Sequence, residues 1–258
     1  MARLQVFTVE SFHKYNPDWQ IIVYLTKQSY KELGANVYVP DYTGPDYFHL
    51  IEKLPYVEIR EIDLLEDGIP LDAHSCQGSD LFRRNILYKK GGVYSDFDVI
   101  WLKPMKDFAK IDCLGDSRDF ESIVSFYEFT KGFHNVSNLV SEPGSGFLLS
   151  LIEAQKKIKP PYEHQSFGST MLNKLYPDWW SVVSRFPRML AIKYETFYPY
   201  STFEMERCFV KDDLSPIDSK NVMCVHWFNG NMYSKEYINK DEFTPCSMTS
   251  ILKREGYI

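Results

Sequence analysis

The sequence predicts an α/β fold in one domain, with a sheet layered between helices. Two observations support this fold class. Short apolar runs typical of strands alternate along the chain with longer segments whose apolar residues have helical spacing. No linker rich in Pro, Gly or Ser and no internal repeat divides the 258 residues. We therefore predict a single domain over residues 1–258.

The N-terminal part predicts a helix followed by two strands. Residues 4–15 place apolar side chains at helical spacing, and Asn16-Pro17-Asp18 ends the pattern. From Gln20 to Leu25 the chain is mostly apolar, which predicts a buried strand. From Val57 to Ile62 apolar and polar residues largely alternate, which is typical of a strand.

The segment from Asp72 to Lys90 predicts a long helix. It begins among polar residues and ends at Gly91-Gly92, and glycine is the usual residue for a left-handed helix terminus. The other expected elements are strands at 93–94, 99–102, 122–126 and 222–225 and helices at 145–157 and 169–175.

Charge and cysteine content exclude several classes of protein. A net charge of −6, without long clusters of Lys and Arg, argues against a nucleic-acid partner. The five cysteines are scattered and form no CxxC pair, so we expect neither a zinc site nor a disulfide framework, and a reducing, cytoplasmic location. No apolar stretch approaches the roughly 18 residues that a transmembrane helix requires, so we expect no transmembrane segment.

Residues 79–99 carry the clearest chemical signal. Asp80 and Arg83 are three positions apart and therefore share one face of the predicted helix. Asp96 and Asp98 alternate along the short extended segment after the glycines. Two carboxylates this close repel each other unless a cation neutralises them, and a metal that bridges a diphosphate is a common reason for such a pair.

Each piece of this run also has an ordinary explanation. Asp80 and Arg83 could form a surface ion pair, the glycines a plain helix end, and Asp96 and Asp98 a pair of solvated turn acids. These explanations do not account for the appearance of the whole run, in this order, within residues 79–99.

The order of these residues resembles a known family. The pattern SD-x-x-R, then LY-x-x-GG-x-Y-x-D-x-D, is similar to the DxD sugar-binding region of glycosyltransferase family 32 and its relatives, including the catalytic domain of the clostridial glucosylating toxins. Weaker similarity extends over most of the chain. The resemblance implies a GT-A-type fold for nucleotide-diphospho-sugar transfer, with a mixed central sheet and helices on both faces.

The resemblance implies a divalent metal, Mn²⁺ or Mg²⁺, which suits oxygen-rich ligands. Asp98 would bind it directly. Asp96 would contact the ribose or sugar and reach the metal directly or through water. His226 would be a third contact to metal or phosphate, and Arg83 would offset charge on the diphosphate, so that Asp96, Asp98 and Arg83 would be the catalytic residues.

The same resemblance implies a set of residues that bind the donor and the sugar. Asp80 and Arg83 would hold sugar hydroxyls, and Tyr94 would line the nucleotide pocket. The remaining members of the expected substrate-binding set are Asn138 and Trp227.

The beginning of the sequence differs from the family pattern. Members of the family open with a strand that contacts the base, whereas this sequence starts at what corresponds to the following helix. Either the start is truncated, or the base is held by other aromatic residues such as Trp19 or Tyr24. Without the opening strand, we expect the strand from Gln20 to Leu25 to be a more exposed edge. Nucleotide binding is then expected to be weak and poorly selective between uridine and guanosine.

These inferences predict a metal-dependent glycosyltransferase that moves a hexose from a UDP- or GDP-sugar to a hydroxyl acceptor. A glycan is the expected acceptor, and the resemblance implies retention at the anomeric carbon. Two alternatives stay open. A metal-dependent hydrolase or nucleotidyltransferase could use the same acids, although neither a further carboxylate cluster nor a Gly-Ser nucleotidyl signature is found. A non-catalytic sugar-nucleotide or glycan-binding protein is the other alternative.

Overall fold

The computed structural model describes residues 1–27, 42–63, 69, 75–110, 122–127, 133–134, 138–163 and 165–258, and structural statements below refer to these residues. Within them the side chains of residues 75, 109–110, 122, 124–127, 133–134 and 138 are not described. None of the described helices is both long enough and apolar enough to cross a bilayer.

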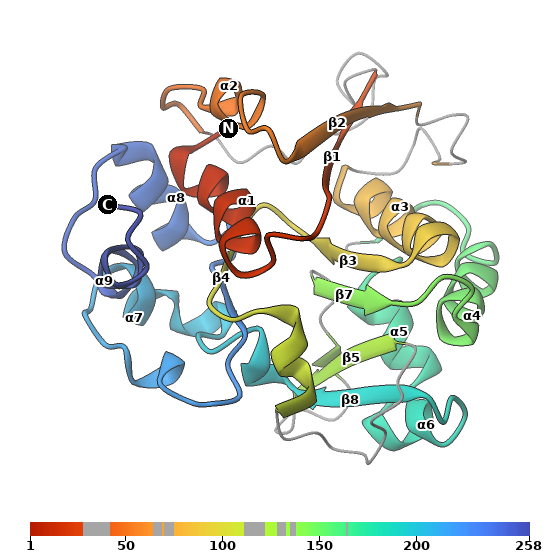
Figure 1. Cartoon of the computed structure of the whole chain (residues 1–258). Helices are drawn as coiled ribbons and strands as arrows, with labels where there is room; N and C mark the ends of the chain where they lie inside the picture. Colours follow the sequence, from red (N-terminus) through yellow and green to blue (C-terminus); the bar gives the residue numbers. More distant parts are fainter. Residues whose placement is uncertain are drawn as a thin grey trace.

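The chain opens with a helix that leads into a small parallel sheet. Helix α1 (Arg3–Tyr15) precedes strand β1 (Ile21–Thr26), and short helix α2 (Phe48–Ile51) precedes strand β2 (Val57–Ile62). Strands β1 and β2 pair in parallel along their whole length, from Ile21 opposite Val57 to Thr26 opposite Ile62. This sheet lies at the top of Figure 1, above the other strands.

A five-stranded mixed sheet forms the centre of the molecule. Its order is β3-β7-β5-β6, with β8 on the other edge of β5; only β5 and β8 run parallel. Figure 1 shows β3, β7, β5 and β8 stacked in this order below β1 and β2. The bounds are β3 (Gly92–Ser95), β5 (Ser122–Tyr127), β6 (Phe133–His134), β7 (Asn138–Ser141) and β8 (Met189–Lys193).

Four helices cover one end of this sheet. Helix α3 packs against α4, and a cluster of buried residues that includes Leu87, Phe147 and Met189 joins these helices to the sheet. Figure 1 shows α3 and α4 beside the ends of β3 and β7, with α5 and α6 next to β5 and β8. The bounds are α3 (Ser75–Lys90), α4 (Gly146–Gln155), α5 (Ser169–Leu175) and α6 (Trp179–Val183).

Strands β4 (Val99–Trp101) and β9 (Cys224–His226) form a third, antiparallel sheet that is fully buried. Side chains of α1 bond to the backbone along β4. Thr8 donates to the Phe97 carbonyl at 2.8 Å, and Ser11 accepts from the Trp101 N–H at 3.0 Å. Helix α1 therefore fixes the backbone on both sides of Asp98.

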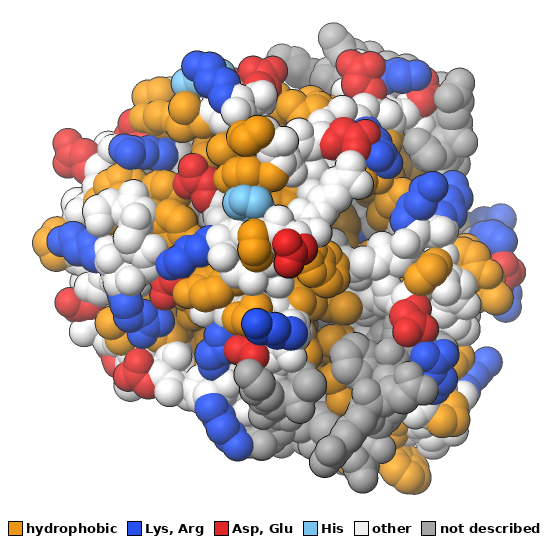
Figure 2. Space-filling view, in the orientation of Figure 1, with side chains coloured by type: hydrophobic (Ala, Val, Ile, Leu, Met, Phe, Trp, Pro, Cys, Tyr) orange, Lys and Arg blue, Asp and Glu red, His pale blue; other side chains and the backbone are white. Residues whose placement is uncertain are grey.

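The C-terminal helices α7 (Met205–Phe209), α8 (Met232–Lys240) and α9 (Ser247–Arg254) cover the other side of α1 and β4. They lie on the left of Figure 1. The short 3-10 turns are η1 (Met105–Lys110), η2 (Tyr194–Thr196), η3 (Thr202–Glu204) and η4 (Ser215–Ile217). On the face shown in Figure 2, basic and acidic side chains are scattered among hydrophobic ones.

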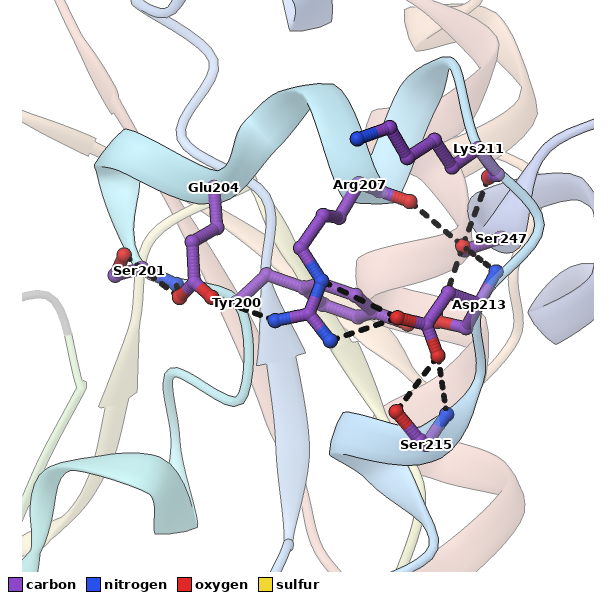
Figure 3. A network of polar contacts seen from close by, with 8 residues as sticks. All are labelled: Tyr200, Ser201, Glu204, Arg207, Lys211, Asp213, Ser215 and Ser247. Atoms are coloured by element: carbon purple, nitrogen blue, oxygen red, sulfur yellow. Dashed lines mark hydrogen bonds and ion pairs between the residues drawn. The ribbon is translucent and has the colours of Figure 1, made fainter.

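A polar network around Ser247 joins α9 to the segment after α7 (Figure 3). The buried hydroxyl of Ser247 accepts from the Asp213 N–H at 2.8 Å and lies 2.7 Å from the Arg207 carbonyl and 2.9 Å from the Lys211 carbonyl. The Arg207 guanidinium in turn contacts the Asp213 carboxylate at 2.7 Å. One hydroxyl thus organises several backbone groups of a turn.

Replacing Ser247 by Ala is expected to lower the free energy of unfolding by about 1–3 kcal/mol, because the Asp213 N–H loses its acceptor. Thermal unfolding should show a fall of roughly 2–4 °C per kcal/mol for a chain of this size. Ser250→Ala on the same helix is the matched control, since Ser250 is only partly buried, whereas Ser247 is fully buried. Equal melting temperatures for the two variants would contradict the role given to Ser247.

The mixed α/β architecture is confirmed, but within the described residues the strands divide among three small sheets instead of one central sheet. Helix α3 ends at Lys90 as predicted, and Gly91 adopts the expected left-handed conformation, with φ of 67°. The predicted helix start at Asp72 lies outside the described residues, where the structure first shows helix at Ser75. Strand β9 begins two residues later than the predicted 222–225 strand.

Candidate functional site

The turn from α3 into β3 places the two aspartates. Gly91 packs so closely against the next turn that a Cβ there would lie 2.6 Å from Cδ of Pro143, and its φ of 67° favours glycine. Strand β3 then pairs with β7 and ends at Ser95, directly before Asp96. The sequence therefore directs the chain from the helix to the acids within a few residues.

Arg83 lies at the centre of a buried polar group. It is 4% exposed, and Nη2 is 3.4 Å from Oδ1 of Asp80 and 3.3 Å from Oδ1 of Asp96. The guanidinium also lies over the ring of Tyr94, 4.6 Å from its centroid, and donates to the Ser79 hydroxyl at 3.0 Å. Asp80 is 5% exposed, so burial excludes the alternative of a surface ion pair.

Tyr94 connects the helix to the first aspartate. Its hydroxyl donates to Oδ1 of Asp96 at 2.9 Å and lies 2.9 Å from the Ser79 hydroxyl. Asp80 also abuts the start of α5, because a Cβ added at Gly168 would lie 2.8 Å from Oδ2 of Asp80. These contacts fix the side of Asp96 that faces α3.

Asp98 is held by the segment that follows β9. Its Oδ1 is 3.1 Å from Nε2 of His226, and its Oδ2 accepts the Asn229 N–H at 2.9 Å. The Asp98 carbonyl accepts from the Trp227 N–H at 2.8 Å. The antiparallel pairing of β4 with β9, which sets Val99 opposite His226, brings these distant segments together.

The pKa values of the two aspartates move in opposite directions. Burial raises the pKa of Asp96 above its usual value, and the nearby Asp98 carboxylate adds to the rise despite the opposing charge of Arg83. Burial alone would also raise the pKa of Asp98, but His226 and the Asn229 N–H bring it below its usual value. Burial lowers the pKa of Arg83, but the negative charges of Asp96 and Asp80 raise it by more. The pKa of Arg83 is therefore above its usual value, and the guanidinium stays protonated.

Asp96, Asp98 and His226 can hold one divalent cation. Each offers a ligand atom, and these atoms all lie within 4.8 Å of one another. Among the described residues, Oδ1 of Asp98 is buried and receives no conventional hydrogen bond, and Nδ1 of His226 is likewise buried without one. Carboxylate oxygens are ligands that suit Mn²⁺ or Mg²⁺, and an imidazole is a common ligand of transition metals. The residues present therefore fit a metal ion.

Asn229 is a member of the site that sequence reasoning missed. Its backbone N–H bonds to Asp98, and its side-chain Oδ1 is buried without a hydrogen-bond partner in the part of the chain that the structure describes. The preceding Phe228 has a φ of 47°, which is rare for a bulky residue, and its ring lies edge-on to His226 at 4.3 Å between centroids. Almost any residue can donate a backbone N–H, so the sequence gives no sign of this role. The Asn229-Gly230 pair indicates only that the chain turns here.

A cavity of about 780 Å³ opens beside this group. Its polar end includes Ser79, Tyr94 and Asp96, and the rest lies between α1, α3, β1 and β3. Trp19 and Tyr24, the expected base contacts, also line it. The cavity therefore joins the acidic group to the region where the base was expected.

Of the predicted site residues, Trp227 is not brought into the group, and the position of the Asn138 side chain is not tested. The Trp227 side chain is fully buried in the hydrophobic cluster of the C-terminal helices, with its ring 6.4 Å from that of Phe209. Successive residues of an extended segment face opposite ways, so His226 points to Asp98 and Trp227 points into the core. Asn138 begins β7 opposite Ser95, and its side chain lies outside the described part.

Comparison with protein families identifies the region that contains the two aspartates. Residues 3–121 match the family model described as "Glycosyltransferase sugar-binding region containing DXD motif". The chain contains a glycosyltransferase-like sugar-binding region. The matched segment is a little less than half of the chain; it holds Asp80, Arg83, Tyr94, Asp96 and Asp98, whereas His226 lies beyond it. The resemblance inferred from the sequence is thereby confirmed for this region.

A solved structure titled "PaToxG Glycosyltransferase" is similar to this chain at 13% sequence identity and a TM-score of 0.44. The similarity covers 72% of this chain and 64% of that one, so it spans less than two thirds of the neighbour's length. The comparison with curated proteins gives no match.

Proposed function

We propose that this protein is a metal-dependent glycosyltransferase that moves a hexose from a UDP- or GDP-sugar to a hydroxyl group, with a glycan as acceptor and retention at the anomeric carbon. One observation carries the proposal. Asp96, Asp98 and His226 converge within 4.8 Å beside the buried Arg83, and the two aspartates are the DXD acids of a sugar-binding region.

The buried residues of the site would bind and orient the donor. Arg83 remains charged and is fixed by Asp80, Asp96 and Ser79, so it presents a rigid cation toward a diphosphate or toward sugar hydroxyls. Ser79 and Tyr94 would contact the donor at the polar end of the cavity. Fixed donors and charges of this kind stabilise a departing anion without reorganising during the reaction.

Asp96, Asp98 and His226 would hold Mn²⁺ or Mg²⁺. When bound, the metal supplies Lewis-acid neutralisation of the diphosphate. Asp98, already positioned by the Asn229 N–H, would be its main ligand.

Retention follows most simply from attack on the same face as the leaving group. The carboxylates near the site, those of Asp80, Asp96 and Asp98, are each engaged by Arg83 or His226. We therefore assign no covalent nucleophile. The bond from the anomeric carbon to the phosphate oxygen breaks, the bond to the acceptor oxygen forms, and the acceptor proton passes to the departing phosphate.

Incubation with a panel of UDP- and GDP-sugars and Mn²⁺, with and without a chelator, tests this proposal. We expect nucleotide release that requires the metal, increases with a glycan acceptor and yields a product of unchanged anomeric configuration by NMR. The four free cysteines among the described residues fit the proposed reducing, cytoplasmic location.

The same panel separates the alternatives. Metal-dependent binding of a donor by calorimetry without any turnover would instead indicate a non-catalytic sugar-nucleotide-binding protein. Release of nucleoside monophosphate and sugar 1-phosphate in place of nucleoside diphosphate would indicate a hydrolase, and sugar 1-phosphate together with a nucleotidylated acceptor would indicate a nucleotidyltransferase.

A further inference from the structure

The two most exposed large hydrophobic side chains in the described part of the chain are those of Phe203, at 93%, and Met232, at 70%. Phe203 is the middle residue of η3, and Met232 is the first residue of α8. A single exposed apolar side chain is ordinary, whereas exposed apolar side chains that lie together indicate a binding surface. The position of the two residues relative to each other therefore decides whether they have a role.

Hydrogen bonds join the two segments that lead to these residues. The His226 N–H donates to the Phe197 carbonyl at 3.1 Å, and the Asn231 side-chain amide donates to the Thr202 carbonyl at 2.9 Å. The two segments therefore run side by side and in the same direction. The two exposed residues follow directly after Thr202 and Asn231, so they lie on neighbouring stretches of backbone.

The same two segments pass the proposed metal ligands. The ring of Tyr198 in the first segment lies edge-on to that of His226 in the second, at 5.2 Å between centroids. Further along the second segment, the Asn229 N–H donates to Oδ2 of Asp98 at 2.9 Å. A turn closed by the Asn231 N–H, which donates to the carbonyl three residues earlier at 2.8 Å, then leads directly into α8. The exposed pair therefore lies where the segment that fixes Asp98 ends.

The proposed donor cavity reaches the acidic group through a different part of the chain. Its lining residues, among those that the structure describes, all fall within residues 8–101, and Asp96 is at its polar end. The exposed pair instead follows the segment that holds Asp98. A donor in the cavity would therefore leave the pair uncovered, and a transfer reaction requires a second substrate beside the first.

Both exposed side chains are carried by a fixed backbone. The Glu204 carboxylate accepts from the Ser201 N–H at 3.1 Å and from the Ser201 hydroxyl at 2.8 Å, which closes the turn that carries Phe203 (Figure 3). The Asn231 side chain accepts the Tyr233 N–H at 3.0 Å and thereby caps α8. Apolar side chains on a fixed backbone lose little conformational entropy when a ligand covers them, which favours binding.

The surroundings of the pair are polar. Phe203 is flanked by Thr202 and Glu204, and the residues before Met232, at 229–231, are Asn-Gly-Asn. A membrane surface or a second copy of this chain would require a continuous apolar area much larger than two side chains. A pyranose ring has an apolar C–H face that packs on an aromatic ring and hydroxyl groups around its edge. A small apolar pair bordered by amides and hydroxyls therefore suits a sugar better than a protein or a bilayer.

We propose that Phe203 and Met232 form a platform for an oligosaccharide, with one pyranose ring stacked on Phe203 and in contact with Met232. The platform rests on the proposed function in one respect, since under that function the bound oligosaccharide is the acceptor. Binding there places the acceptor beside the segment that contains His226 and fixes Asp98. An acceptor held next to the donor reacts faster than one that arrives by chance encounter.

Titrations followed by saturation-transfer NMR test the platform without turnover. The probes are short gluco-, manno- and galacto-oligosaccharides, offered at millimolar concentration with UDP and Mn²⁺ present. We expect at least one probe to bind to the wild type, and Phe203→Ala to weaken its binding about tenfold because the stacking ring is lost. Met232→Ala should weaken it roughly threefold, since a methionine side chain contributes a smaller apolar contact.

Two further variants separate stacking from general effects. Phe203→Trp keeps an aromatic ring and should bind the probe at least as well as the wild type. Trp180→Ala removes a ring on α6 that is 63% exposed, and it should leave binding of the probe unchanged. Because the Phe203 ring is almost fully exposed, Phe203→Ala should also keep the wild-type melting temperature.

Nucleotide release from the donor panel, measured on the same proteins, separates the platform from the proposed function. Turnover whose KM for the oligosaccharide is unchanged in Phe203→Ala would overturn the platform and leave the proposed function standing. Oligosaccharide binding that depends on Phe203, without turnover of any donor, would keep the platform and overturn the proposed function. The platform would also be overturned if no probe bound to the wild type, or if sedimentation showed a dimer that Phe203→Ala dissociates.

Discussion

Asp98→Asn is expected to lower the rate of sugar transfer about a hundredfold or more while leaving the protein folded. Asn has nearly the same size and can still accept the Asn229 N–H, but it lacks the negative charge that lies 3.1 Å from His226 and that the proposed metal requires. Loss of one direct electrostatic contact costs roughly 3 kcal/mol in the transition state. Steady-state rates over a range of Mn²⁺ concentrations, with melting temperatures in parallel, measure both effects.

The matched control is Asp212→Asn, because Asp212 is exposed and lies in the segment between α7 and η4, away from the site. We expect this variant to keep the wild-type rate and the wild-type response to Mn²⁺. Near-wild-type turnover by Asp98→Asn in the presence of a chelator would show that the metal assignment is wrong.

Local sequence determined the elements that could be predicted. The helix from Ser75 to Lys90 and the turn at Gly91 follow from spacing and glycine chemistry within one segment. Strand β8, Met189–Lys193, was not predicted, because so short an apolar run does not distinguish a strand from buried helix. Strand β9 begins two residues later and ends one residue later than the predicted strand, because its bounds depend on pairing with β4 rather than on its own apolar residues.

The candidate site likewise has contacts that follow from local sequence and contacts that depend on the fold. The relation of Asp80 to Arg83 follows from helical spacing, and both are on α3 as expected. The 3.3 Å contact from Arg83 to Asp96 depends on the turn geometry, and the approach of Asn229 to Asp98 depends on tertiary packing. Neither contact is encoded in the spacing of residues, so a sequence pattern can identify the DXD acids and nominate Arg83 and His226, but it does not identify the contact from Asn229.

Asp80→Asn is expected to weaken the binding of a nucleoside diphosphate sugar at least tenfold and the binding of the bare nucleotide diphosphate less than threefold. Asp80 is buried against Arg83 and Gly168, and we propose that its charge orients the guanidinium toward the donor sugar. A tenfold loss corresponds to about 1.4 kcal/mol, within the range for a hydrogen bond to a charged group. Calorimetry with both ligands at one Mn²⁺ concentration measures the difference.

Glu153→Gln provides the control for loss of an ion pair without loss of a site contact. Glu153 pairs with Lys156 at 2.7 Å on α4, also at three-residue spacing, but its side chain is 55% exposed. Exposed pairs contribute under about 1 kcal/mol, so this variant should bind both ligands normally and melt near the wild-type temperature. Asp80→Asn leaves Arg83 its contacts with Asp96 and Ser79, which should preserve the fold. Equal losses of affinity for the sugar nucleotide and the bare nucleotide would remove Asp80 from the sugar-binding set and assign it to the positioning of Arg83 alone.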